Sequence, residues 1–293
     1  MHSTALFAAL AGLALSVPAS AANVLVLSSG DPATDNAVIA TLTSRGHTCT
    51  LGPQYYNFTG QGLTGYDTVY LQANNNWWAG WLSNAAAQSL MTWVNAGGRL
   101  VTSEWVTYYS GTVDDAFYSI RSYLPLVRTT NYGNATSTTY DRAILNGPLN
   151  AGLPDSFTFP LVNYASGGTE IHTVARANAN TWYTSRGSAG AAGLVGWLKG
   201  YGFVYSFSTT CGPAQLADPN FGRFFSNVMG FICEPNCDHS TAAPVLNVND
   251  FNCFLSRFAA GESTANCDRS TIPPVLNVND FACFLSQFAA GCQ

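Results

Sequence analysis

The chain ends in two copies of one segment, CDHSTAAPVLNVNDFNCFLSRFAAG at residues 237–261 and CDRSTIPPVLNVNDFACFLSQFAAG at residues 267–291. Twenty of the 25 aligned positions are identical, and the two copies are 30 residues apart. Each copy has a polar loop bounded by aspartates, followed by apolar residues at helical spacing. The repeat therefore predicts two loop–helix units of the same shape at the end of the chain.

The two polar loops carry oxygen atoms at the spacing of a calcium-binding loop. Such a loop of about 12 residues takes side chains from its first, third, fifth, ninth and last positions. With one inserted residue, each loop here fills the first, third, ninth and last positions. We expect Ca²⁺ to be bound by Asp238, Ser240, Asn247 and Asp250 in the first copy, and by Asp268, Ser270, Asn277 and Asp280 in the second.

The repeat resembles dockerin domains in its loop, its helix pattern and its period. Its final Gly291-Cys292 resembles in particular the cysteine-containing kind of dockerin that ends in Phe-Ala-x-Gly-Cys. The resemblance covers residues 236–292. It implies a small all-α, calcium-binding domain at residues 234–293 that docks onto a cohesin-like or surface protein. The loops depart from the pattern, because the acid at the fifth position is missing and prolines replace the loop glycine at Pro244 and Pro274. A helical tail held by disulfides alone is the alternative.

Eight cysteines favour an oxidising compartment. Six of them crowd the last 61 residues, at positions 233, 237, 253, 267, 283 and 292. Six cysteines allow 15 sets of three disulfides, and the sequence leaves the choice open. Zinc is the alternative at Cys233-x3-Cys237. The large N-terminal part holds only Cys49 and Cys211, which we expect to be paired or close.

The N-terminus has the pattern of a secretory signal peptide. An apolar stretch at residues 5–17 precedes Ala19-Ser20-Ala21, which fits the small-x-small rule for cleavage, although no Lys or Arg comes before it. We expect residues 1–21 to be removed and the protein to be secreted or attached to a cell surface. A buried helix of the mature domain is the alternative.

Charged residues make up only 9% of the chain, the formal net charge is −5, and Lys199 is the single lysine. No basic patch is present, so nucleic acid is not an expected partner. No other stretch approaches 18 uninterrupted apolar residues, so no membrane span is expected after the signal peptide is removed.

Residues 22–233 alternate between short apolar strands and helical patterns, which predicts an α/β domain with a doubly wound, mostly parallel sheet. Gly193–Trp197 and Tyr201–Ser206 are expected to form a hairpin, and the polar stretch at 129–139 is expected to be a loop. The expected strands are residues 24–27, 48–51, 68–71 and 100–103, and the expected helices are 36–45, 84–95 and 220–232.

The order of these elements resembles the flavodoxin-like fold of class I glutamine amidotransferases, and more closely their non-amidotransferase relatives of the trehalose-utilisation type. The resemblance also uses residues 142–147 before a Leu-Pro, and the closing pattern Gly-x-Val-x-x-Phe-Ser … Asn-Phe-x-Arg-Phe-Phe-x-Asn at residues 202–227. Amidotransferases of this fold place a nucleophilic cysteine after the strand that corresponds to residues 100–103. Here that turn reads Ser103-Glu104-Trp105, which excludes thioester chemistry at that position.

Glu104 nevertheless follows a strand end, where ligands bind in open α/β sheets. His47 and His172 stand without a partner motif, so we expect both to be structural, and we interpret Asp114-Asp115 as a solvated turn. No GxSxG, HExxH, P-loop or GxGxxG motif occurs. No catalytic residue is therefore assigned.

Aromatic residues mixed with amides follow the third strand, including Trp77, Trp78 and Trp81. Indoles stack on the CH faces of sugar rings, so these residues and Glu104 are candidate ligand contacts. Packing of the loop onto its own domain is the alternative. The sequence thus predicts a secreted or surface-attached protein with an anchoring module and an α/β domain that binds a carbohydrate or another extracellular ligand. The rival class is a polysaccharide hydrolase, which needs two facing carboxylates that the sequence does not identify.

Overall fold

The structure is a computed structural model. It describes residues 21–74, 76–133, 135–144, 149–161, 170–186, 191–200, 202–230, 235, 237–238, 246–262, 265–267 and 273–290. The predicted signal peptide lies outside these residues, apart from Ala21.

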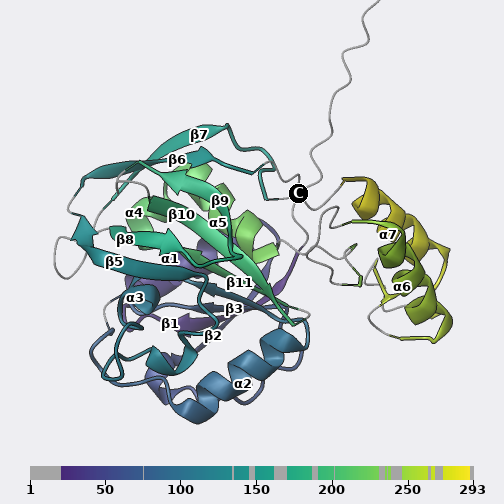
Figure 1. Cartoon of the computed structure of the whole chain (residues 1–293), viewed down its shortest axis with the longest axis horizontal. Coiled ribbons are helices and arrows are strands. Elements are labelled where there is room, and N and C mark those ends of the chain that lie inside the picture. Colours follow the sequence, from purple (N-terminus) through teal and green to yellow (C-terminus); the bar gives the residue numbers. More distant parts are fainter. Residues whose placement is uncertain are drawn as a thin grey trace, which may run out of the picture.

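A nine-stranded sheet forms the α/β domain, in the order β2-β1-β3-β4-β11-β10-β9-β6-β7 (Figure 1). Its first five strands run parallel. The predicted parallel arrangement is therefore confirmed for this half of the sheet. These strands are β2 (Thr48–Gln54), β1 (Asn23–Ser28), β3 (Thr68–Leu71), β4 (Arg99–Thr102) and β11 (Gly202–Phe207).

The second half of the sheet is antiparallel. The predicted hairpin is confirmed, because β10 pairs with β11. A separate two-stranded sheet joins β5 and β8. The antiparallel strands are β10 (Ala191–Lys199), β9 (Asn180–Ser185), β6 (Ser137–Arg142) and β7 (Ser156–Pro160), and the small sheet has β5 (Leu126–Gly133) and β8 (Glu170–Ala175).

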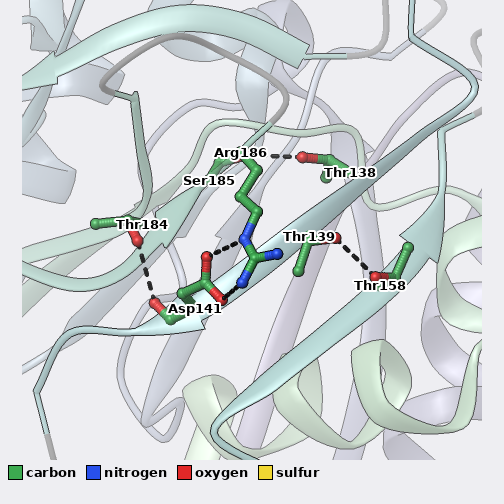
Figure 2. A network of polar contacts seen from close by, with 7 residues as sticks. All are labelled: Thr138, Thr139, Asp141, Thr158, Thr184, Ser185 and Arg186. Carbon is green, nitrogen blue, oxygen red and sulfur yellow. Dashed lines mark hydrogen bonds and ion pairs between the residues drawn. The ribbon is translucent and has the colours of Figure 1, made fainter.

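The prediction of a loop at residues 129–139 is wrong, because β5 and β6 occupy most of it. In β6, Thr138 and Tyr140 are buried while their neighbours are more exposed, so the strand alternates although its composition is polar. Threonine favours strands through its branched Cβ. Figure 2 shows the polar pairs that hold this region, such as Thr139 with Thr158 at 2.7 Å and Arg186 with Asp141 through two bonds of 2.6 Å.

Helices cover both faces of the parallel half. Alternate residues of β1 face opposite ways, so Val24 and Val26 pack with helices α1 and α5, whereas Leu25 and Leu27 pack with α2. This two-sided cover explains why the central strands β1 and β3 are apolar over most of their length. The helices are α1 (Pro32–Thr43), α2 (Asn84–Asn95), α3 (Glu104–Tyr108), α4 (Pro213–Leu216) and α5 (Pro219–Gly230), with 3₁₀ turns at Tyr55–Asn57 and Tyr118–Ile120.

Two helices of the C-terminal repeat occupy equivalent positions, α6 (Val248–Ala259) and α7 (Val278–Ala290). Their equivalent phenylalanines, Phe254 and Phe284, stack with ring centroids 4.2 Å apart and form the centre of a small core. The disulfides are also equivalent, Cys237–Cys253 and Cys267–Cys283. The first and last of the six cysteines, 233 and 292, lie outside the described residues.

The expected pairing of Cys49 with Cys211 is wrong, because both are free thiols. Cys49 lies near the start of edge strand β2, paired in register with Val24. Cys211 follows β11 and contacts Tyr70 of β3, and β1 stands between β3 and β2 in the sheet. A disulfide needs Cα atoms within about 7 Å, which two strand spacings of about 4.8 Å already exceed.

The two described disulfides should stabilise the repeat. Each closes a loop with a sequence separation of 16 residues, which corresponds to about 3 kcal/mol of unfolding free energy in the chain-entropy account. We expect the paired change Cys237→Ser with Cys253→Ser to lower the unfolding temperature of the repeat, whereas Cys49→Ser leaves it unchanged. Peptide mapping that found either half-cystine bonded to a different cysteine would contradict the assignment.

Candidate functional site

The carboxyl ends of β1, β3, β4 and β11 meet at one edge of the sheet. The chain leaves β1 for β2 on one side and then returns past it to β3 on the other, so the strand order reverses between β1 and β3. In open α/β sheets this reversal point is the usual ligand site. The residues after these strands therefore form the candidate ligand site.

Glu104 is the first residue of α3 and is fully buried at this edge. Its Oε1 accepts a hydrogen bond from the Thr210 hydroxyl, which follows β11. Tyr70 lies beside Ser103, Glu104 and Cys211, and burial raises the pKa of its phenol well above the ordinary value. Burial, with a further contribution from Glu104, also raises the pKa of the Cys211 thiol. A thiol in this environment stays protonated and is a poor nucleophile.

A second set of contacts fixes the turn after β1. Asp35 accepts bonds from the Ser28 hydroxyl at 2.6 Å, the Ser29 amide at 2.8 Å and the Gln72 amide at 3.2 Å. Gly30 in this turn has a φ of +79°, and an added Cβ would come within 2.8 Å of the Gln54 Oε1. The turn between β1 and α1 is thus held closely against the end of β3.

Hydrogen bonds with the end of β2 and the 3₁₀ turn that follows it hold the loop after β3 in place. The Tyr55 hydroxyl donates to the carbonyls of Asn76, at 2.7 Å, and Gly80, at 3.0 Å. The Asn76 side chain donates to Gln54 at 2.9 Å. A loop with these bonds presents its side chains in a fixed arrangement.

The three tryptophans of this loop have different roles. Trp77 stacks on Tyr109 with ring centroids 4.5 Å apart, so it packs the loop onto the domain as the alternative interpretation expected. Trp78 and Trp81 have exposed fractions of 72% and 65%. The Trp81 indole nitrogen donates to the Asp114 carbonyl, which fixes that ring beside the turn at residues 112–115. Of the four predicted ligand contacts, Trp78 and Trp81 therefore remain available to solvent, whereas Glu104 is buried and Trp77 is stacked on Tyr109.

His47 is a structural residue at the opposite end of the sheet. Its Nδ1 accepts from the Ala22 amide at 3.1 Å, which leaves the proton on Nε2, 2.9 Å from the Ser226 hydroxyl. His172 lies within β8 as predicted, and its side chain is outside the described residues. The Asp115 carboxylate accepts from the Thr112 amide, as expected of a turn.

In the first calcium loop, the predicted ligands double as helix caps. Asn247 is the N-cap of α6, and its oxygen accepts from the Asn249 amide at 2.8 Å. Asp250 is fully buried and accepts from the amides of Asp238, at 3.1 Å, and Asn247, at 2.8 Å. The reciprocal bonds between Asn247 and Asp250 form a capping box. In the sequence, the capping box and the calcium loop place the same residue types at the same positions.

The second loop repeats this arrangement where it is described. Asn277 accepts from the Asn279 amide at 2.8 Å, and the buried Asp280 accepts from the Asn277 amide at 2.8 Å. The other predicted ligands, Ser240, Asp268 and Ser270, lie outside the described residues. Within the described part of the chain, no group of three or more His, Cys, Asp or Glu side chains is arranged to hold a metal.

The first loop brings two of its predicted ligands, Asp238 and Asp250, close to each other. Burial raises the pKa of Asp250, and the neighbouring carboxylate of Asp238 raises it further, against two backbone bonds that lower it. Two acidic side chains are thus held together at the start of α6. Each bonded carboxylate oxygen keeps a second lone pair, and a hard cation between the two would remove their repulsion.

No helix in the described residues is long and apolar enough to cross a membrane.

No protein-family model and no curated protein matches the chain. Among solved structures, the chain is similar to the cytoplasmic proteins STM3548 and STM1381 of Salmonella typhimurium, both with a TM-score of 0.53, at 16% and 15% identity. These matches cover 72% and 71% of this chain and 98% of each of those chains. A ThuA-like protein from Bacteroides uniformis matches with a TM-score of 0.51 at 10% identity, over 78% of this chain and 94% of that one. These likenesses concern the fold, and they confirm the expected amidotransferase-like α/β architecture of the ThuA type.

The buried contacts of His47 should make stability depend on pH. Burial lowers the pKa of His47, and the nearby Arg99 lowers it further. The unfolded chain takes up a proton near pH 6.5 while the folded chain does not, so stability is full above about pH 6.5 and falls as the pH drops towards the folded pKa. We expect chemical unfolding between pH 7 and 5 to show a smaller fall for His47→Gln than for the native chain. Equal slopes for the two proteins would contradict this role.

Proposed function

We propose that this protein is exported, that its C-terminal repeat is a dockerin-like, calcium-binding anchor, and that its α/β domain binds carbohydrate. The observation that carries the carbohydrate proposal is the pair of exposed indoles, Trp78 and Trp81, on a loop held by buried hydrogen bonds. Exposed apolar surface that is grouped, rather than scattered as single residues, marks binding sites, and these two indoles lie on one loop. Sugar rings stack on such indoles through their CH faces.

Export is supported by the disulfides. Both described pairs lie in a domain whose own core is small, and such domains depend on disulfides in oxidising compartments. The predicted removal of residues 1–21 agrees with this location. An exported protein that binds polysaccharide gains from an anchor, because anchoring keeps it near an insoluble ligand.

A docking face is supported by exposed apolar residues that recur in the repeat. Val248 and its equivalent Val278 are 68% and 76% exposed, and Leu255 and its equivalent Leu285 are 39% and 42% exposed. Both helices therefore show the same apolar residues to solvent. We propose that a cohesin-like or surface protein covers them. Binding to an immobilised cohesin domain, with and without chelator, tests this part of the proposal.

The first experiment addresses carbohydrate binding. We expect Trp78→Ala and Trp81→Ala each to weaken retention on insoluble polysaccharide, by roughly tenfold, because each removes one stacking surface. Trp78→Phe keeps an aromatic face and should keep part of the binding. Pull-down on cellulose, xylan and chitin measures the effect, and unfolding temperatures should stay unchanged because both rings are exposed. Retention that is unaffected by the double Ala variant would reject the proposal.

The second experiment addresses calcium. With two carboxylates in each loop, we expect dissociation constants on the order of 10⁻⁵ to 10⁻³ M and a rise in the melting temperature of the repeat with calcium. Asp238→Asn is the informative variant, because its exposed side chain can be changed without loss of the helix cap made by Asp250. Asp250→Asn should destabilise α6 even without calcium, and Glu262→Gln is the matched control outside the loops. Calorimetry with no heat of binding, and no melting shift at millimolar calcium, would show that the disulfides act without metal.

A further inference from the structure

The fold brings together basic side chains that are far apart in the sequence. Arg121 follows the 3₁₀ turn at Tyr118–Ile120, Arg176 follows β8, and Lys199 ends β10. All three residues are partly exposed. The sequence contains no basic stretch, so this basic cluster, formed by Arg121, Arg176 and Lys199, is a product of the fold.

The charges of the basic cluster are close enough to repel one another. Partial burial lowers the pKa of Arg176, and the positive charge of Arg121 lowers it further. The pKa of Lys199 is lowered in the same way, first by partial burial and then by the charge of Arg176. Each neighbour thus opposes the charge of the next.

Backbone contacts explain why the three segments meet. The Arg176 amide donates to the Pro125 carbonyl at 2.8 Å, where the pairing of β5 with β8 ends. The Trp197 indole nitrogen, in β10, donates to the Tyr123 carbonyl at 2.6 Å. The segment at 121–125 is therefore held between the end of β8 and the end of β10.

The two arginines are fixed by carbonyls and by a ring. The Arg176 guanidinium donates to the carbonyls of Leu124, at 2.9 Å, and Arg121, at 3.2 Å. The Arg121 guanidinium donates to the Tyr118 carbonyl at 3.0 Å and lies 3.4 Å from the centroid of the Tyr118 ring. An arginine has five N–H donors, so both side chains keep donors for a ligand.

Lys199 is held in place by aromatic rings. Its ammonium group lies 3.5 Å from the centroid of the Trp197 ring and 5.6 Å from that of Tyr123. It makes no hydrogen bond within the described residues. Trp197 and Tyr123 are themselves partly exposed, so the cluster combines charge with flat apolar surface.

No acidic residue compensates the basic cluster within the described part of the chain. Residues 84–103, 116–140 and 171–217 contain no Asp or Glu. Two other arginines, Arg142 and Arg186, do form ion pairs with aspartates. The helix α2 ends near the cluster, where Tyr123 donates to Asn95 at 2.9 Å, but a helix end carries only about half a negative charge. The cluster therefore has an excess of positive charge in a chain whose net charge is −5.

The surroundings limit which anionic ligand fits. Nucleic acid carries one charge per about 1.7 Å of duplex, and domains that bind it are strongly basic, whereas this chain has a pI near 5.2. A ligand whose charges are separated by uncharged rings meets less repulsion from the rest of the protein. Sugar rings also stack on aromatic side chains such as Trp197 and Tyr123.

We propose that the basic cluster binds an acidic polysaccharide through the carboxylate or sulfate groups on its sugar rings. The inference rests on the proposed function for its class of ligand, and it assigns a second surface. Lys199 pairs with Gly202 at the turn from β10 to β11, which lies beside the amino end of β4. Trp78 and Trp81 follow the carboxyl end of β3, so the two surfaces belong to opposite ends of the sheet.

The test is calorimetry of the full chain with polygalacturonate, dextran sulfate and uncharged dextran. A chelator in the buffer prevents calcium from bridging the acidic chain and the acidic polymer. We expect polygalacturonate, dextran sulfate or both to bind more tightly than dextran, and this binding to weaken as salt rises. Which of the two polymers binds identifies the charged group.

Variants assign the binding to the cluster. Lys199→Gln and Arg121→Gln should each weaken it by roughly threefold to fivefold, and the double variant by roughly tenfold or more. Lys199→Arg keeps the charge and should keep the binding. Arg45→Gln is the matched control, because it changes the net charge equally at an exposed residue after α1, on the other face of the sheet from Trp197.

Several results would overturn the inference. Equal losses in Lys199→Gln and Arg45→Gln would show a general effect of net charge. Tighter binding to duplex DNA than to either acidic polysaccharide would assign the cluster to nucleic acid. Loss of acidic-polysaccharide binding in Trp78→Ala would show that the two surfaces are one. If neither acidic polysaccharide binds while retention on cellulose persists, the second surface is wrong and the proposed function stands.

Discussion

The parallel pairing of β1 with β2 on one side and with β3 on the other is the constraint on which the rest of the domain depends. This pairing makes the strand order reverse beside β1, so the turns after β1 and β3 diverge at one edge of the sheet. It also requires helices on both faces, which α1 and α5 supply on one side and α2 on the other. The apolar strands and the polar edge are two consequences of the same topology.

The C-terminal repeat depends on a local feature, the position of an aspartate three residues after each helix N-cap. In the first copy, Asp250 uses both carboxylate oxygens to hold backbone amides, and one of those amides belongs to Asp238 at the other end of the loop. The loop is therefore closed by hydrogen bonds, and Cys237–Cys253 closes it covalently as well. A metal ion bound here would add to these closing contacts between the two ends of the loop.

Helices and strands that are bounded by capping or turn residues could be predicted from the sequence. The helix Asn84–Asn95 matches its prediction because Ser83 caps its start and Gly97-Gly98 follow its end. The strand Thr68–Leu71 matches because four buried residues stand between polar turns. The stretch at 129–139 could not be predicted, since its threonines, asparagines and single serine are typical of loops, and it forms strands only through pairing with distant β7, β8 and β9. The error at Cys49 and Cys211 has the same cause, because their separation is set by the strand order.

The sequence predicted the location of the candidate site better than it predicted the residues that form it. The strand ends pointed to Glu104 and the tryptophan loop, and the structure brings these to one edge. The sequence does not distinguish Trp77, which is stacked, from Trp78 and Trp81, which are exposed, because burial depends on Tyr109 from a different segment. Gln72, Asn74 and Thr107 carried no sequence signal either, since amides and threonines after a strand are ordinarily solvated. Their burial at this edge is a property of the fold, because it depends on how the segments after β3 and β4 pack against each other.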